Sequence, residues 1–304
     1  ILPCPSWVSY SPQAQFLQKK VFWINCDETT NWHLTADRLH AHCLENLAEN
    51  KLLILNSPNN PSGTCHEDLE SIAEVCRKFK VIVISDEIYA ELDFLGNYNS
   101  ISHFYPEGTI ITSGLSKWCG AGGWRLGTLI FPNELSEICQ KVKALASETF
   151  SSVSAPIQYA SIKAFTNDHS DYLNNSRIIL KTISEYIYKE MSSIGIGCVK
   201  PQGGFYMLCD FSKIVKKTNE IYNSTSLCEK LLSDIGFAML PGINFGLDDK
   251  SFITRIAFVD FDGENALKFL NENQKIELSD FKKLFPKIYE GIEELKRWLA
   301  SINN

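Results

Sequence analysis

The sequence predicts an α/β fold, with a large domain built on a mostly parallel sheet (residues 1–180) and a smaller C-terminal α+β domain (residues 181–304). Short apolar runs alternate with amphipathic helical stretches in the first half, which is the order typical of parallel sheets. A long helical stretch follows, and after it strands and helices mix. The length of 304 residues and the 44% hydrophobic content suffice for a sizeable core, arranged in two lobes.

Four apolar runs predict the strands of the large domain: 51–58, 81–87, 109–113 and 127–131. Between the first two, residues 66–79 have helical spacing, with acidic residues early and basic residues late, as the helix dipole prefers. Polar stretches close the first three strands: 56–64, 85–89 and 113–117. Because the carboxyl ends of parallel strands share one edge of a sheet, we expect these stretches to assemble a single site.

The smaller domain begins with an amphipathic stretch, residues 171–195, that predicts a long helix linking the two lobes. A helix near 225–235 and a strand at 252–259 follow. The tail at 281–300 predicts a surface helix with Pro286 near its start.

Composition excludes several classes of partner. A net charge of -7, without basic runs longer than pairs, argues against nucleic acid. No stretch of about 18 apolar residues predicts a membrane span, and no signal peptide is evident. The ten cysteines are scattered without a CxxC, which favours reduced thiols in a cytoplasmic protein. The "HAHC" at 40–43 has helical spacing that separates its two histidines, so no metal is expected.

The stretch "SGLSKWCGAGGWRLG" (113–127) places Lys117 and Arg125 eight residues apart among glycines. Lys117 follows an apolar strand, where partial desolvation would make its amine a nucleophile or base. A solvent-exposed loop lysine is the ordinary alternative. The glycines allow the backbone to approach a bound group closely.

Three more residues stand at the other strand ends. Asp86 could cap a backbone, Tyr89 could be packing, and Asn60 could be a turn residue. Together with Lys117 and Arg125, however, they fit one cofactor, pyridoxal 5'-phosphate. Its aldehyde requires a lysine, its ring nitrogen an acid (Asp86), its phenolic oxygen donors (Asn60 and Tyr89), and its phosphate an arginine.

At this point the sequence resembles the class-I aminotransferases. The 113–127 stretch matches that family's lysine-attachment signature, and "SPNNPSGT" and "SDEIYAEL" resemble its two preceding motifs in the right order. "PSWVSY" resembles the segment whose aromatic residue stacks on the cofactor ring, which nominates Trp7. "TRIAF" resembles the strand whose arginine grips the substrate carboxylate, which nominates Arg255, with Asn60 beside it.

The resemblance spans essentially the whole chain. It implies the fold-type-I architecture and pyridoxal-phosphate-dependent transamination between an L-amino acid and a 2-oxo acid, in a homodimer. Lys117, Asp86 and Tyr89 would be catalytic.

Two departures from the family pattern stand out. The family has a portion ahead of "PSW", including a phosphate-binding loop, and we expect this chain to lack it and to bind cofactor weakly. Many members also carry a hydroxyl three residues before the lysine, where this chain has Gly114, so Ser116 is nominated as the substitute.

Two alternatives remain open at this stage. A β-lyase or a cyclopropane-carboxylate-type synthase would use the same fold and the same residues. A truncated, non-catalytic paralogue acting as a binding protein would also carry the resemblance.

Overall fold

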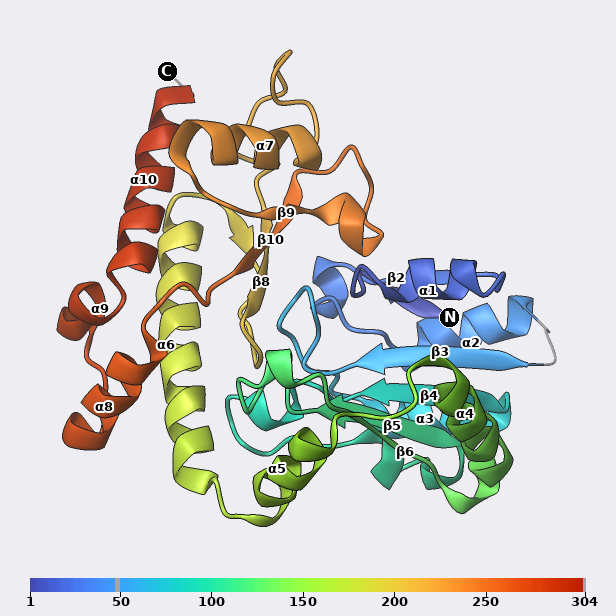
Figure 1. Cartoon of the computed structure of the whole chain (residues 1–304). Coiled ribbons are helices and arrows are strands. Elements are labelled where there is room, and N and C mark those ends of the chain that lie inside the picture. Colours follow the sequence, from blue (N-terminus) through green and yellow to red (C-terminus); the bar gives the residue numbers. More distant parts are fainter. Residues whose placement is uncertain (47–49, 303–304) are drawn as a thin grey trace.

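The computed structural model describes residues 1–46 and 50–302, which form two lobes (Figure 1). The first lobe holds a four-stranded sheet in the order β3-β4-β5-β6. The first three strands run parallel and the last runs antiparallel, which confirms the mostly parallel sheet. The strands are β3 Lys51–Asn56, β4 Val81–Asp86, β5 Thr109–Gly114 and β6 Gly127–Ile130. A two-stranded parallel sheet joins β1 Leu2–Cys4 to β2 Trp23–Asn25.

One face of this sheet shares a core with helices of the first lobe. The helices of the first lobe are α1 Tyr10–Phe16, α2 Ala36–Glu45, α3 Leu69–Lys78, α4 Ser136–Thr149 and α5 Ala155–Thr166. Helix α3 forms because the Asp68 side chain caps its first turn at Ser71 N, and because its apolar residues recur at helical spacing. Its buried residue Ile72 shares one core with Leu53 and Val83 of the sheet.

The second lobe is an antiparallel sheet packed against helices. Its strand order is β7-β8-β10-β9, with β7 Gly197–Cys198, β8 Tyr206–Asp210, β9 Leu240–Pro241 and β10 Ile253–Ala257. Its helices are α6 Ser170–Ser193, α7 Ser224–Ile235, α8 Gly263–Asn273, α9 Leu278–Leu284 and α10 Pro286–Ile302.

Helix α6 links the lobes and is the longest helix in Figure 1. Its buried residues Ile179 and Ile183 share a core with Leu92 and Leu115 of the first lobe. Arg177 of α6 also donates from Nε to the backbone oxygen of Glu91, at 2.9 Å. The predicted domain boundary at residue 180 falls inside α6, which contacts both lobes. The structure therefore does not test where one domain ends and the other begins, and the boundary stays a prediction.

The tail differs from the single surface helix expected at 281–300. Two helices occur there, and Pro286 begins the second one, where the missing N–H costs no hydrogen bond. One face of α10 is buried, including Ile292 and Leu295, so the helix belongs to the core of its lobe. The expected surface location was therefore wrong for that face.

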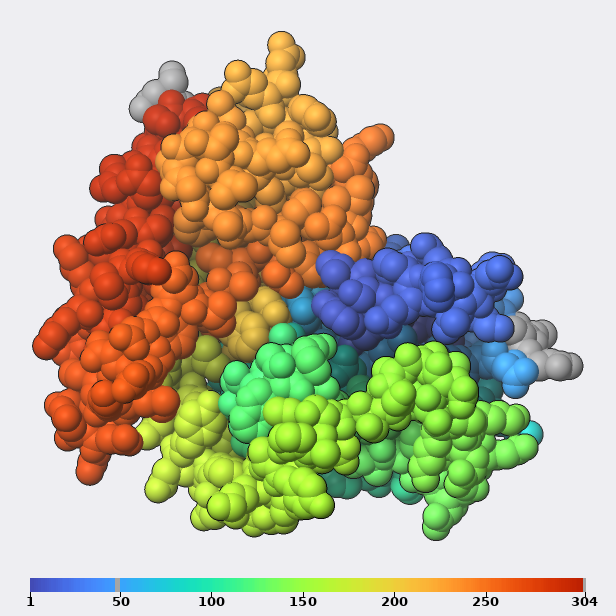
Figure 2. All heavy atoms as spheres, in the orientation of Figure 1, coloured from blue at the N-terminus to red at the C-terminus, as the bar shows by residue number. Residues whose placement is uncertain are grey.

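Two segments connect the lobes directly. Gln202, just before β8, donates its N–H to Gly63 O (2.8 Å) and accepts from the N–H of Phe94 (2.9 Å). Ser6 donates its N–H to Phe245 O (3.0 Å), so the N-terminal residues touch the second lobe. In Figure 2 the blue N-terminal part of the chain meets the orange part of the second lobe.

The first lobe exposes apolar side chains on β6, α4 and α5. Helix α4 has no buried residue, and Leu129 and Ile130 of β6 are 51% and 58% exposed. Tyr159 of α5 is 76% exposed. Apart from this exposed surface, none of the helices among residues 1–46 and 50–302 has the length and apolar character that a membrane crossing requires.

Candidate active site

One cavity of about 360 Å³, at the junction of the two lobes, gathers every residue nominated from the sequence. These residues are Trp7, Asn60, Asp86, Tyr89, Ser116, Lys117, Arg125 and Arg255. Most of them follow the carboxyl ends of β3, β4 and β5, the expected edge of the sheet. Arg255 comes from β10 of the second lobe, so the cavity requires both lobes.

The strand register brings the first group together. Asn56, Asp86 and Thr112 are aligned across β3, β4 and β5, and all three line the cavity. The Asn56 amide donates from Nδ2 to the backbone oxygen of Asp86, at 2.9 Å, and its Oδ1 accepts from the N–H of Asn60, at 2.8 Å. Asn56 thus fixes the loop that carries Asn60. The sequence reasoning missed this residue, although it lies in the "NSPNNPSGT" stretch.

The pKa of the Asp86 carboxyl is set by effects of opposite sign. Burial raises its pKa, while a hydrogen bond from Tyr10, the N–H of Ile88 and the charge of Lys117 act in the opposite direction. The Tyr10 hydroxyl donates to Asp86 Oδ2, and Ile88 donates to Oδ1 at 3.2 Å. Tyr10 was not nominated, although it ends the "PSWVSY" stretch. Its ring packs edge-on against Trp7, with centroids 5.2 Å apart.

Arg255 lies deep between the lobes. Its guanidinium carbon sits 4.3 Å from the centre of the Tyr206 ring and 5.0 Å from that of Phe245. Its Nη1 donates to Asn60 Oδ1 at 3.0 Å, while its Nε is buried without a hydrogen-bond partner. Among the described residues no acid pairs with it, which argues against an ordinary surface ion pair. A buried, unpaired N–H is unfavourable unless a ligand accepts from it.

Lys117 is half-buried beside aromatic rings. Its Nζ lies 5.8 Å from the centre of the Tyr89 ring and 5.7 Å from that of Phe205. Burial, followed by the neighbouring Tyr206, raises the pKa of Tyr89, so its hydroxyl stays protonated and able to donate. That hydroxyl donates to Tyr206 Oη at 3.4 Å.

The segment after Lys117 curls around one side of the cavity. Arg125 adopts the left-handed conformation, with φ of 55°, and donates from Nη1 to Gly122 O at 2.6 Å. A Cβ at Gly114 would lie only 2.7 Å from Leu126 O, so a hydroxyl-bearing residue at this position would require the backbone to shift. Gly120 has φ of +64°, whereas Gly123 has open space around it. Glycine is therefore required at some of these positions and optional at others.

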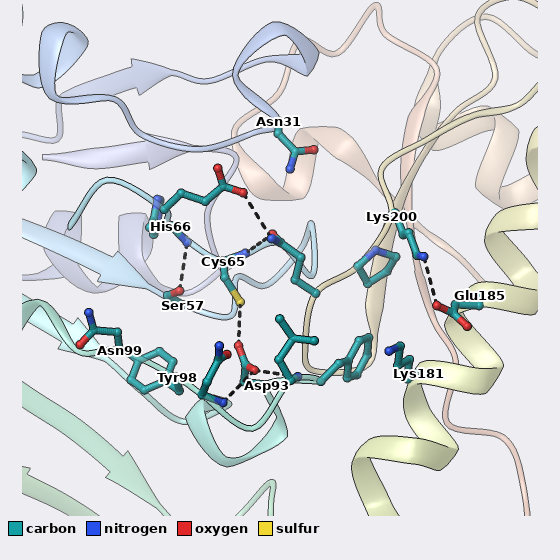
Figure 3. Close-up of a pocket in the computed structure, with 16 residues that line it drawn as sticks. Asn31, Ser57, Cys65, His66, Asp93, Tyr98, Asn99, Lys181, Glu185 and Lys200 are labelled. Atoms are coloured by element: carbon teal, nitrogen blue, oxygen red, sulfur yellow. Dashed lines mark hydrogen bonds and ion pairs between the residues drawn. The ribbon is translucent and has the colours of Figure 1, made fainter. Parts of the chain in front are cut away.

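A second, larger cavity of about 650 Å³ is lined by none of the nominated residues (Figure 3). It holds the ion pair between Lys200 Nζ and Glu185 Oε1, at 3.1 Å, and the contact between Cys65 Sγ and Asp93 Oδ2, at 3.6 Å. Of the two lysines that line this cavity, Lys200 is already paired to an acid of its own lobe, and residues of both lobes line the cavity, so the arrangement fits a structural junction.

Comparison with known proteins accords with this geometry. The family model described as aminotransferase class I and II matches residues 1–270. An aspartate aminotransferase of Bacillus sp. (strain YM-2) is 32% identical over 253 residues, covering 81% of this chain and 62% of that protein. An aspartate aminotransferase of Bacillus subtilis is 28% identical over 283 residues, covering 90% of this chain and 70% of that protein.

Solved structures show the same fold. The aromatic aminotransferase of Pyrococcus horikoshii is similar with a TM-score of 0.79 and 25% identity, over 99% of this chain and 72% of that one. The aspartate aminotransferase of Thermus thermophilus with maleate is similar with a TM-score of 0.76 and 25% identity, over 89% of this chain and 67% of that one.

Fold and cavity together define a two-lobed α/β protein with a lysine-centred site between its lobes. The chain belongs to the class I and II aminotransferase family, and its architecture is that of fold type I. It spans 62% of the length of the Bacillus sp. relative.

Proposed function

We propose that this chain catalyses pyridoxal-phosphate-dependent transamination between an L-amino acid and a 2-oxo acid. The observation that carries the proposal is the single cavity in which Lys117, Asp86 and Arg255 meet, although they lie far apart in the sequence. Family membership supports the same activity. The names of the relatives make aspartate the first amino acid to test.

The residues of the cavity fit the cofactor and a substrate carboxylate. Arg255 Nε is a buried donor without a partner, and a carboxylate, an amine and a second arginine share its cavity. Lys117 and Asp86 would hold the aldehyde and the ring nitrogen, while Arg125 and Ser116 would hold the phosphate. Trp7 would lie against the ring. When bound, the cofactor accepts the electron pair that remains when a substrate Cα loses its proton.

The chain's own residues then perform four tasks. Lys117 Nζ takes the proton from the substrate Cα and later returns one. Asp86 would keep the ring nitrogen of the cofactor protonated, because a buried negative charge favours a protonated neighbour. Tyr89 and Asn60 donate hydrogen bonds to the phenolic oxygen. Arg255 binds the carboxylate shared by amino acid and oxo acid, in a two-pronged contact.

Product analysis tests the proposal. The purified chain, supplied with pyridoxal phosphate, L-aspartate and 2-oxoglutarate, should release the matching oxo acid and glutamate without ammonia. Ammonia release would instead indicate a β-lyase, and 1-aminocyclopropane-carboxylate from a suitable substrate would indicate a synthase. No product from any amino acid, with no visible absorbance gained from the cofactor, would favour a binding protein.

We further propose that the protein works as a homodimer in the cytoplasm. The exposed apolar side chains on β6, α4 and α5 support association, since patches of this kind mark interaction surfaces. The free state of all ten cysteines supports a reducing compartment. Sedimentation at several protein concentrations tests the dimer, and a purely monomeric species at micromolar concentration would contradict it.

A further inference from the structure

Tyr10 connects two residues of the cavity that are distant in sequence. It is the first residue of α1 and the only buried residue of that helix. Its hydroxyl donates to Asp86 Oδ2, at the end of β4 in the sheet. Its backbone N–H bonds to Trp7 O, at 3.2 Å, and its ring packs against the Trp7 ring at 80°. A single side chain therefore fixes both the acid and the aromatic residue.

The bond from Tyr10 occupies one oxygen of Asp86, the N–H of Ile88 occupies the other, and the Thr112 side chain also bonds to this carboxylate. A carboxylate that accepts bonds on both oxygens cannot rotate freely, and all of these donors favour its ionised form. Tyr10 remains a donor there, because burial raises its pKa well above the usual range and keeps its proton in place.

We infer that Tyr10 is a positioning residue that acts through Asp86, holding its carboxylate oriented and ionised in the cavity. The inference rests on the proposed function, because an ionised Asp86 matters to catalysis only if it holds a proton on the cofactor ring. Without the Tyr10 hydroxyl, Asp86 remains partly buried but loses a donor that offsets the cost of burying its charge.

Other charged and titratable groups also act on Asp86. Lys117, from the segment after β5, and Tyr89, on the segment after β4, interact with it. Arg125 and Arg255 line the same cavity. The effect of Tyr10 must therefore be measured as a difference between variants in which these groups are unchanged.

The experiment compares Tyr10→Phe with the wild type and with Tyr105→Phe, a matched loss of a hydroxyl from a buried tyrosine that lies outside the cavity. The titration of Asp86 is followed in the cofactor-free protein by ¹³C NMR of labelled aspartate carboxyls, with Asp86→Asn identifying the signal. Steady-state kcat and KM are then measured in the presence of saturating pyridoxal phosphate.

Tyr10→Phe should move the Asp86 titration upward by about one pH unit or more, as expected when a carboxylate loses one donor. It should also lower kcat roughly tenfold while leaving KM for the amino acid within about twofold. Tyr105→Phe should do neither.

An unchanged Asp86 titration in Tyr10→Phe would overturn the inference, whether or not kcat falls, because the tyrosine would then act only on packing. An equal fall of kcat in Tyr105→Phe would also overturn it. A third outcome is that the Asp86 titration shifts in Tyr10→Phe while the wild type does not transaminate at all. The proposed function would then be wrong, and Tyr10 would have no role in such a reaction.

Discussion

Replacing Arg255 with lysine keeps a positive charge in the cavity but removes the planar guanidinium. The native side chain donates from Nη1 to Asn60 Oδ1 at 3.0 Å and holds a buried Nε without a partner. A lysine offers one ammonium, which cannot grip a carboxylate with two parallel bonds. Losing one charge-assisted bond costs about 1.5–3 kcal/mol, or roughly 10- to 150-fold in affinity.

Because amino acid and oxo acid share the carboxylate, Arg255→Lys should raise KM for both by a similar factor. Initial-rate measurements with each substrate varied in turn would check this, with Arg177→Lys as a matched control. Arg177 is a largely buried arginine that pairs with Glu91 and lies outside the cavity. Unchanged KM values for Arg255→Lys, or equal effects in the control, would refute carboxylate binding and leave Arg255 a structural residue.

Three other predictions concern acid–base chemistry and packing. Asp86→Asn should lower kcat by about 10² or more. Because burial raises the pKa of Asp86 in the folded state, ionising this carboxyl lowers the free energy of unfolding of the wild type. In urea unfolding, the stability of the wild type should therefore fall relative to that of the variant as pH rises through the range in which Asp86 ionises. Gly114→Ser should lower the free energy of unfolding by about 1–3 kcal/mol, because its Cβ would crowd Leu126 O, whereas Gly123→Ala should change it by less than about 0.5 kcal/mol. Burial lowers the pKa of His66 to about 3, so the folded state holds this side chain neutral. The free energy of unfolding should therefore fall as pH drops from about 6.5 towards 3, because the unfolded chain takes up a proton at His66 that the folded chain does not. In acid-unfolding curves, His66→Gln should reduce the proton uptake on unfolding by about one proton.

Much of the sheet, and the meeting of the nominated residues in one cavity, could be predicted from the sequence. Strands such as 81–87 are continuous apolar runs because both faces of a parallel strand are usually covered. Their polar ends must share one edge, which is why Asp86 and Lys117 were expected together and lie in one cavity. Their roles in catalysis stay predictions.

The supporting residues were harder to predict. Tyr10 and Asn56 act through hydrogen bonds to residues 76 and 4 positions away, and neither spacing has a local signature. The crowding at Gly114 was equally hidden, since it depends on the approach of the backbone of Leu126, the residue just before β6. The break at Phe285 in the tail was missed because helical periodicity continues across it, although Pro286 marked the site.

The proposed function requires that Lys117 bond covalently to pyridoxal phosphate. The most direct measurement is to incubate the purified chain with the cofactor, reduce it with borohydride, digest it and locate the label by mass spectrometry. The label should sit on the peptide containing Lys117 and should disappear in Lys117→Arg, a variant that keeps the charge. Label on another lysine, or equal labelling of the variant, would contradict this role of Lys117.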